Sequence, residues 1–203
     1  MSIHALILAG GRGSRLGEIR KGDLRMAGAT LFERIAGQFR DVGTPLLISV
    51  GTDAPAQAMP GMILPDLDLP IGGPLAGLVA AAAYLDRAPP EDMLVTVAVD
   101  TPFLPSDYVR RLVAAMDGGG AAAEAGWRGN FYPTNACWRL SALAGLPQMA
   151  REGTLPKSAK AMLAKAGAVN VDWSATHQLD PFANINTLDD LVTLARRAHT
   201  TSP

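Results

Sequence analysis

Short apolar runs alternate with helix-like segments through the first half of the chain, and this alternation constrains the fold more than any other feature. Residues 5–8 form an apolar run that ends at glycines, which is typical of a strand buried on both faces. Further strands are expected at 45–51, 62–66 and 94–99. Helical spacing and small side chains predict helices over 30–39, 74–85 and 106–116. This order predicts an α/β fold in which helices flank a largely parallel sheet.

The second half of the chain is less regular. Residues 118–140 are similar to two strands around a loop, 145–167 to one helix with a loop before it, and 170–173 to a short strand. A helix is expected over 186–198, where Thr187 is followed three residues later by Asp190 in a capping pattern. Ser106 is the expected N-cap of the helix at 106–116. No linker divides the chain, so one domain over residues 1–203 is expected.

The bulk composition narrows the class of protein. With 203 residues, of which 48% are hydrophobic, the chain is long enough to bury a full core. A net charge of -1 and the absence of a basic run argue against nucleic acid as a partner. The start of the chain has no basic segment typical of a signal peptide, and the most lipid-like stretch, 73–85, is shorter than the ~20 residues that span a bilayer. We therefore expect no membrane contact and a cytoplasmic location.

The cysteine and the histidines of this sequence indicate neither a nucleophile nor a metal site. Cys137 is the single cysteine and lies in a strand-like segment, so we expect a buried core thiol rather than a nucleophile. His4, His177 and His199 are scattered without the paired spacing of metal ligands. A zinc site is therefore not expected.

Glycines and cations crowd together directly after the first strand. Glycine lets a backbone approach a ligand closely, and arginine and lysine bring positive charge, so the segment predicts a phosphate-binding turn. The residues concerned are Gly10, Gly11, Arg12, Gly13, Arg15, Gly17, Arg20 and Lys21. The spacing fits neither a P-loop nor a dinucleotide fingerprint. A plain tight turn with surface arginines is the alternative interpretation.

A carboxylate follows the clearest strand of the chain. Asp100 comes directly after the run at 94–99, as the glycine turn comes directly after 5–8. Ligands of open α/β sheets bind beyond the carboxyl ends of the strands, so both features are expected at one edge. Phosphate-binding groups beside a carboxylate predict a phosphorylated ligand with a divalent metal. Asp100 also suits a simple turn before Pro102.

Four motifs in order resemble the nucleotidyltransferase family that includes the molybdenum cofactor guanylyltransferases. They are LAGGRGSRLG at 8–17 followed by Lys21, GGPLAG at 72–77, VDTPFLP at 99–105 and NINTLDDL at 184–191. The resemblance implies a three-layer, Rossmann-like nucleotidyltransferase fold with a mostly parallel central sheet. It also implies an Mg2+-dependent enzyme that transfers GMP from GTP to the molybdenum-molybdopterin cofactor and releases pyrophosphate. Transient contact with cofactor biosynthesis proteins and acceptor molybdoenzymes is expected with it.

The resemblance also implies roles for individual residues. Nucleotide binding falls to Leu8, Ala9, Gly10, Gly11, Gly13, Lys21, Asp66 and Asp100. Catalysis falls to Arg15, Lys21 and Asp100, with Asp100 holding Mg2+, and acceptor binding to Asn184 and Asn186. Gly73 and Gly77 would let the following helix approach the nucleotide, and close packing of that helix alone is the alternative interpretation. Asp66 also suits a solvated loop, and the two asparagines also suit helix capping.

This chain departs from the family pattern at two positions. Arg20 precedes Lys21 where the family usually has aspartate, and Asp23 is a candidate substitute partner for the lysine. Ser49 stands where the guanylyltransferases commonly carry asparagine. Gly10 in LAGG favours guanine, because relatives that transfer cytidylate commonly have alanine there. A cytidylyltransferase, a sugar-phosphate nucleotidyltransferase and a non-catalytic nucleotide-binding chaperone of the cofactor are the alternative functions.

Overall fold

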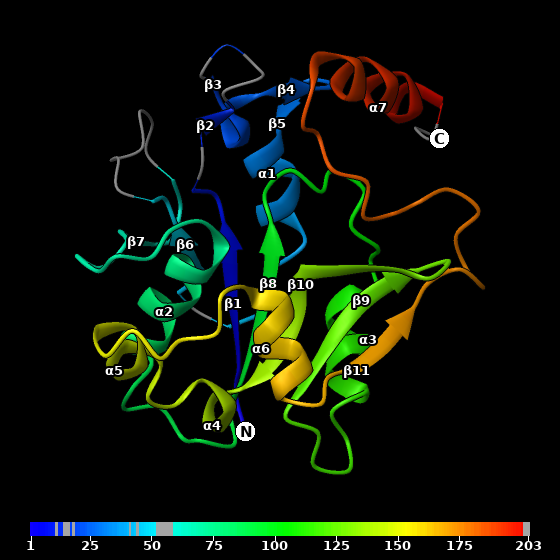
Figure 1. Ribbon diagram of the computed structural model, residues 1–203. Coiled ribbons are helices and arrows are strands. Elements are labelled where there is room, and N and C mark those ends of the chain that lie inside the picture. The colour runs from blue at the N-terminus through cyan, green and yellow to red at the C-terminus, as the bar shows by residue number, and fades with distance from the viewer. Residues whose placement is uncertain are drawn as a thin grey trace.

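The computed structural model describes residues 1–10, 12–13, 17, 19–40, 42–43, 45–51 and 59–200. A seven-stranded sheet in the order β11-β9-β10-β8-β1-β6-β7 forms the centre of the molecule (Figure 1). Its strands are β1 (Ile3–Leu8), β6 (Leu47–Ser49), β7 (Met62–Leu64), β8 (Met93–Ala98), β9 (Ala122–Trp127), β10 (Asn130–Arg139) and β11 (Val169–Asp172).

The sheet is mostly parallel, as predicted. Strand β1 pairs in parallel with β6 and β8, β6 with β7, and β9 with β11. Only β10, among the described strands of this sheet, runs antiparallel to its neighbours β8 and β9. The hairpin expected over 118–140 is therefore present as β9 and β10.

Helices cover both faces of the sheet and produce three layers. Alternate residues of β1 point to opposite faces, so Ala5 and Ile7 join one core cluster and Leu6 and Leu8 join another. The first cluster packs under α1 (Leu31–Gly37) and α3 (Tyr108–Ala114). The second packs under α2 (Pro74–Tyr84), α4 (Leu140–Leu143), α5 (Leu146–Arg151) and α6 (Ala159–Lys165). The predicted three-layer α/β fold is confirmed.

Smaller elements lie beyond the carboxyl ends of β1 and β8 (Figure 1). They are the hairpins β2 (Arg12–Gly13) with β3 (Ile19–Arg20) and β4 (Arg25–Met26) with β5 (Ala29–Thr30), a 3-10 turn at Lys21–Asp23, and helix α7 (Leu188–Thr200). A third apolar cluster joins Leu24 and Met26 to Ile185 and Leu194. The segment around residues 24–26 and the C-terminal segment are thereby brought together over the sheet edge. No described helix is long and apolar enough to cross a membrane.

Of the two helix caps expected from the sequence, the one at α7 is confirmed and the one at α3 is not. Thr30 and Glu33 form a reciprocal capping box at α1, and Thr187 Oγ1 accepts from the Asp190 N–H at α7 (3.1 Å). The expected cap at Ser106 is wrong, because the first helical bond of α3 runs from Arg111 N to Asp107 O. The Asp107 side chain instead accepts a hydrogen bond from Trp173 Nε1 (2.8 Å).

The expected single helix over 145–167 is also wrong. Two helices, α5 and α6, fill this range, and residues 152–158 separate them. Gly153 adopts a φ of +68°, which favours glycine and ends α5, and the Ser158 hydroxyl accepts from the Ala161 N–H to begin α6. Apolar residues have helical spacing both before and after residues 152–158, so only Gly153 and Ser158 indicated the break between the two helices.

Candidate active site

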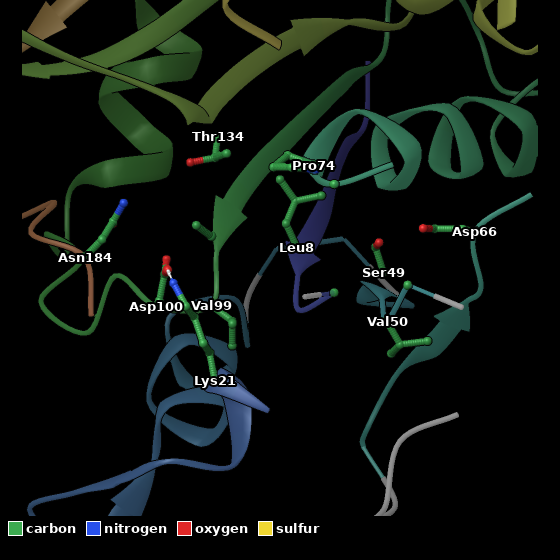
Figure 2. Close-up of a pocket in the computed structure, with 14 residues that line it drawn as sticks. Leu8, Lys21, Ser49, Val50, Asp66, Pro74, Val99, Asp100, Thr134 and Asn184 are labelled. Carbon is green, nitrogen blue, oxygen red and sulfur yellow. Dashed lines mark hydrogen bonds and ion pairs between the residues drawn. The ribbon is translucent and has the colours of Figure 1, made fainter. Parts of the chain in front are cut away.

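A cavity of about 590 Å3 opens at the carboxyl edge of β1, β6 and β8 (Figure 2). Its walls come from segments that are far apart in the chain. The lining residues are Leu8, Gly10, Lys21, Ser49, Val50, Gly51, Asp66, Gly73, Pro74, Ala98, Val99, Asp100, Thr134 and Asn184. This is the edge at which α/β sheets bind their ligands.

Lys21 and Asp100 meet at the wall of this cavity. The Lys21 Nζ donates to Asp100 Oδ2 at 2.6 Å, and Figure 2 shows the two side chains pointing toward one another. The lysine belongs to the 3-10 turn after β3, and the aspartate follows β8. Their side chains are 22% and 13% exposed, so the ion pair is partly shielded from water. The expected meeting of the glycine-turn lysine and the strand-end carboxylate is therefore present.

The same lysine contacts the C-terminal asparagine segment. Lys21 Nζ also donates to Asn186 Oδ1 at 2.7 Å, and the Ile185 N–H donates to the Asp100 backbone oxygen at 3.2 Å. The expectation that Asp23 would replace the missing aspartate partner is wrong, since Asp23 lines a separate hollow beside α1. Lys21 is oriented by contacts across the tertiary structure rather than by a neighbour in sequence.

Asn184 and Asn186 lie beside Asp100 rather than serving as helix caps. Capping of α7 falls to Thr187 and Asp190, whose Oδ2 accepts from the N–H groups of Asn186 (3.0 Å) and Thr187 (2.8 Å). The Asn184 side chain lines the cavity and accepts from Thr101 Oγ1 (3.3 Å). Both asparagine side chains therefore face the site, where their role in acceptor binding stays a prediction.

Asp66 lines the opposite wall, near Ser49 (Figure 2). Its Oδ1 is buried and has no hydrogen-bond partner among the described residues. Burial raises the pKa of this carboxyl group. A buried, unpaired acceptor in a cavity wall is suited to a ligand that donates hydrogen bonds, which the solvated-loop interpretation does not explain.

Only some described residues of the glycine turn are found at the cavity. Leu8 and Gly10 line the cavity, whereas Ala9 does not, and its N–H donates to Ser49 O (2.8 Å). The expected role of Ala9 in nucleotide binding therefore stays a prediction. Gly13 lies in β2. Gly11 and Arg15 lie outside the described residues, so their expected roles stay predictions.

Sequence reasoning did not assign several of the lining residues to the site. Val50 and Gly51 follow β6, so the strand-end rule that located Asp100 could have found them. Thr134 had no such signal, because it reaches the cavity from an irregularity in the antiparallel strand β10. Gly73 lines the cavity, whereas Gly77 does not and has the packing role of the alternative interpretation. A Cβ there would lie 2.8 Å from Leu8 Cδ2 and would overlap the Ser49 side chain, so only glycine lets α2 approach this closely.

The residues present fit a magnesium ion. Among the described residues, no three His, Cys, Asp or Glu side chains gather as a metal cage. Mg2+ typically binds one or two carboxylates and completes its shell with substrate phosphates and water. Asp100, partly buried at the cavity wall beside a cation that attracts phosphate, supplies the one carboxylate such an ion needs.

Comparison with known proteins places the chain in a family. The model of the MobA-like NTP transferase domain matches residues 5–169, which include most of β1, the Lys21 turn, α2 and Asp100. The chain belongs to the MobA-like NTP transferase family. It is therefore a nucleotidyltransferase, and the cavity is the candidate active site of such an enzyme.

Relatives of known name match almost the whole chain. The molybdenum cofactor guanylyltransferase of Rhizobium meliloti (strain 1021) is 33% identical over 193 residues, which cover 92% of this chain and 88% of that protein. The protein of the same name from Rhodobacter capsulatus is 35% identical over 204 residues, with 100% of both chains covered. The second match covers the whole chain, so it extends past the MobA-like domain model and includes the segment that carries Asn184 and Asn186.

Solved structures share the fold. Molybdopterin-guanine dinucleotide biosynthesis protein A from Archaeoglobus fulgidus superposes with a TM-score of 0.75 at 21% identity, covering 99% of this chain and 100% of that one. The 2-C-methyl-D-erythritol 4-phosphate cytidylyltransferase of Thermus thermophilus superposes with a TM-score of 0.64 at 21% identity, covering 97% and 100%. The MobA-like architecture is thus shared by nucleotidyltransferases whose names specify different nucleotides.

Replacing Asp66 by asparagine tests whether its buried carboxylate is kept for a ligand. Because burial raises the pKa of Asp66, the folded state loses stability as the pH rises through that pKa. Asp66→Asn is therefore expected to raise the Tm at pH 7, to match wild type in acid where Asp66 is protonated in both states, and to weaken nucleotide affinity about tenfold. Thermal melts across pH and nucleotide titrations measure both effects. Asp68→Asn, an exposed neighbour, should change neither; unchanged nucleotide affinity in Asp66→Asn would refute the assignment.

Proposed function

We propose that this nucleotidyltransferase transfers GMP from GTP to the molybdenum-molybdopterin cofactor and releases pyrophosphate, with Mg2+ as cofactor. The observation that carries the proposal is the contact of Lys21 with Asp100 and Asn186, which brings the expected phosphate, metal and acceptor groups to one cavity. The names of the relatives at 33% and 35% identity support guanylate as the transferred group and the molybdenum cofactor as the acceptor.

The chemistry requires positioning and charge neutralisation rather than a nucleophilic side chain. The acceptor phosphate is ionised at neutral pH, so it attacks the α-phosphorus without a general base, and pyrophosphate leaves. Lys21 would neutralise charge on the triphosphate, and backbone amides of the glycine turn would bind its oxygens. Bound at Asp100, Mg2+ would supply further neutralisation of phosphate charge. Asn184 and Asn186 would orient the acceptor. Buried Cys137, whose pKa burial raises to about 12, takes no part.

Gly10 lies against the backbone at the end of β6, which leaves little room for a side chain. A methyl group at this position would lie 2.9 Å from the Gly51 backbone nitrogen, so one of these two cavity segments would have to shift. Gly10→Ala is expected to lower kcat/KM for GTP about tenfold, as one misplaced wall of a binding site would. Gly37→Ala is the matched control, because a methyl group there meets nothing within 4 Å. Steady-state rates with GTP measure the effect, and equal rates for Gly10→Ala and wild type would contradict it.

A pyrophosphate-release assay tests the proposal and separates the alternatives. Purified protein is mixed with Mg2+, molybdenum-loaded molybdopterin and GTP, CTP or UTP in turn. Release with GTP that requires the acceptor supports the proposal. Preference for CTP identifies a cytidylyltransferase, and UTP turnover with a sugar phosphate identifies a sugar-phosphate nucleotidyltransferase. Nucleotide binding without release identifies the non-catalytic chaperone.

The proposed activity also implies where the protein works and with what. A cofactor guanylyltransferase would act in the cytoplasm as a single domain over residues 1–203. It would receive its acceptor from cofactor biosynthesis proteins and pass the product to molybdoenzymes through transient contacts.

A further inference from the structure

Strand β10 carries a bulge where it passes the carboxyl end of β8. Tyr132 pairs with Ala125 of β9 and Ala136 pairs with the adjacent Glu124, so residues 133–135 fall between two consecutive partners. Asn135 in this bulge is fully buried, with 0% of its surface exposed. Bulges beside active sites commonly redirect a side chain. This bulge directs Asn135 against the end of β8.

One backbone group determines which way the Asn135 amide is turned. Asn135 Oδ1 accepts a hydrogen bond from the Ala98 N–H at 2.9 Å. A backbone N–H only donates, so the side-chain atom that meets it must be the oxygen. The Asn135 Nδ2 group is therefore the end that faces Thr101, and it donates to Thr101 Oγ1 at 3.4 Å.

The direction of this hydrogen bond influences that of the next one, between Thr101 and Asn184. The fully buried Thr101 hydroxyl accepts from Asn135 and still has one proton to donate. A buried O–H needs an acceptor, and among the described residues Asn184 Oδ1 (3.3 Å) is the acceptor it reaches, so the proton is donated to that oxygen. This leaves the Asn184 Nδ2 group, with its two N–H donors, for a ligand in the cavity that Asn184 lines beside Asp100 (Figure 2).

We propose that Asn135 is a positioning residue that sets the hydrogen-bond polarity of Asn184 through the Thr101 hydroxyl. Asn184 then presents donors to an oxygen of the acceptor phosphate, which only accepts. An amide turned the other way would place its own oxygen against that anion. The backbone bond from Ile185 N to Asp100 O holds the segment in place, while the side-chain relay selects the end that faces the ligand. The identity of the acceptor rests on the proposed function; the relay rests on the contacts.

Two substitutions of Thr101 separate polarity from packing. Thr101→Val removes the hydroxyl at nearly constant volume, so Asn184 loses its fixed orientation, and we expect the Kd for molybdopterin to rise about tenfold. The Kd for GTP should stay within about twofold, because the relay lies on the acceptor side. Thr101→Ser keeps the hydroxyl and should restore molybdopterin binding. Equilibrium titration of the full chain with molybdopterin and, separately, with GTP measures all of these.

Asn135→Asp reverses the relay without touching Asn184. The new carboxylate accepts from both the Ala98 N–H and the Thr101 hydroxyl, so Thr101 offers only a lone pair and Asn184 turns its oxygen to the cavity. Molybdopterin binding should weaken at least as much as in Thr101→Val. The double variant Asn135→Asp/Thr101→Val should bind molybdopterin little more weakly than Thr101→Val alone, because the Thr101 hydroxyl through which Asn135 acts is already absent.

The outcomes distinguish the relay from the proposed function. Equal weakening of molybdopterin binding by Thr101→Val and Thr101→Ser, or no weakening by Thr101→Val and Asn135→Asp, would overturn the relay. Wild-type protein that binds molybdopterin but releases no pyrophosphate from GTP would refute guanylyl transfer, while the relay would still be decided by the variants. Wild-type protein that does not bind molybdopterin would overturn both.

Discussion

Asp100→Asn is expected to lower kcat for guanylyl transfer about 1,000-fold, the largest effect of any substitution considered for this protein. The amide keeps the size of the side chain but removes the charge that would hold Mg2+ and that pairs with Lys21 Nζ at 2.6 Å. Both losses fall on the transferred phosphate, whose charge grows in the transition state, so kcat should fall much more than nucleotide affinity. Pyrophosphate release at saturating GTP and acceptor measures kcat, and nucleotide titration measures affinity.

Asp117→Asn is the matched control for this experiment. Asp117 is exposed after α3 and does not line the cavity, so the same chemical change there should leave kcat at the wild-type value. Manganese binding followed by electron paramagnetic resonance adds a readout that does not depend on turnover, and Asp100→Asn should weaken it. An Asp100→Asn protein with wild-type kcat would remove the metal assignment and the proposed mechanism with it.

Lys21→Met is expected to lower kcat by about 100-fold to 1,000-fold. Methionine preserves the length and apolar stem of the side chain but removes the ammonium group, which contacts both Asp100 and Asn186. The transition state would lose the cation expected to neutralise the triphosphate, and Asp100 would lose its partner. Lys21→Arg should recover only part of the rate, because a planar guanidinium cannot reproduce the contacts of a compact ammonium. Steady-state pyrophosphate release measures kcat for each protein and should decrease from wild type to Lys21→Arg to Lys21→Met.

The control for Lys21 is a lysine outside the cavity. Lys157 is exposed in the turn before α6, so Lys157→Met removes one positive charge without altering the site. Its kcat should equal that of wild type, and the Tm of Lys21→Met should show that the variant is folded. A Lys21→Met enzyme as fast as Lys157→Met would assign the ammonium to packing of the C-terminal segment alone.

Much of the fold was predictable because it depends on local patterns. The buried runs at 5–8 and 94–99 became β1 and β8, and the rule that ligands bind at strand ends correctly brought Asp100 to the same edge as Gly10 and Lys21. The cap at Thr187 could also be read from four residues of sequence. In each case the interacting groups are close along the chain, or a general rule for parallel sheets relates them.

Other features were not predictable because they depend on contacts between distant segments. Asp107 rather than Ser106 is the N-cap position of α3, and its carboxylate accepts from Trp173, 66 residues away. Asp23 was the sequence neighbour available to Lys21, yet Asp100 and Asn186 took that role across 79 and 165 residues. Hydrophobic periodicity carries no information about which polar groups will be left to pair when the layers assemble.

The sequence by itself determined the α/β fold with helices flanking a largely parallel sheet, the edge at which ligands bind, and the cation and carboxylate that meet there, because apolar periodicity and strand-end geometry act locally. Only the tertiary structure decided the partners of Lys21, the unpaired oxygen of Asp66 and the relay from Asn135 to Asn184. The physical reason is that buried polar groups must find hydrogen-bond partners among whatever the packed chain brings within reach. Those partners exist only once the sheet, the β10 bulge and the C-terminal segment have come together.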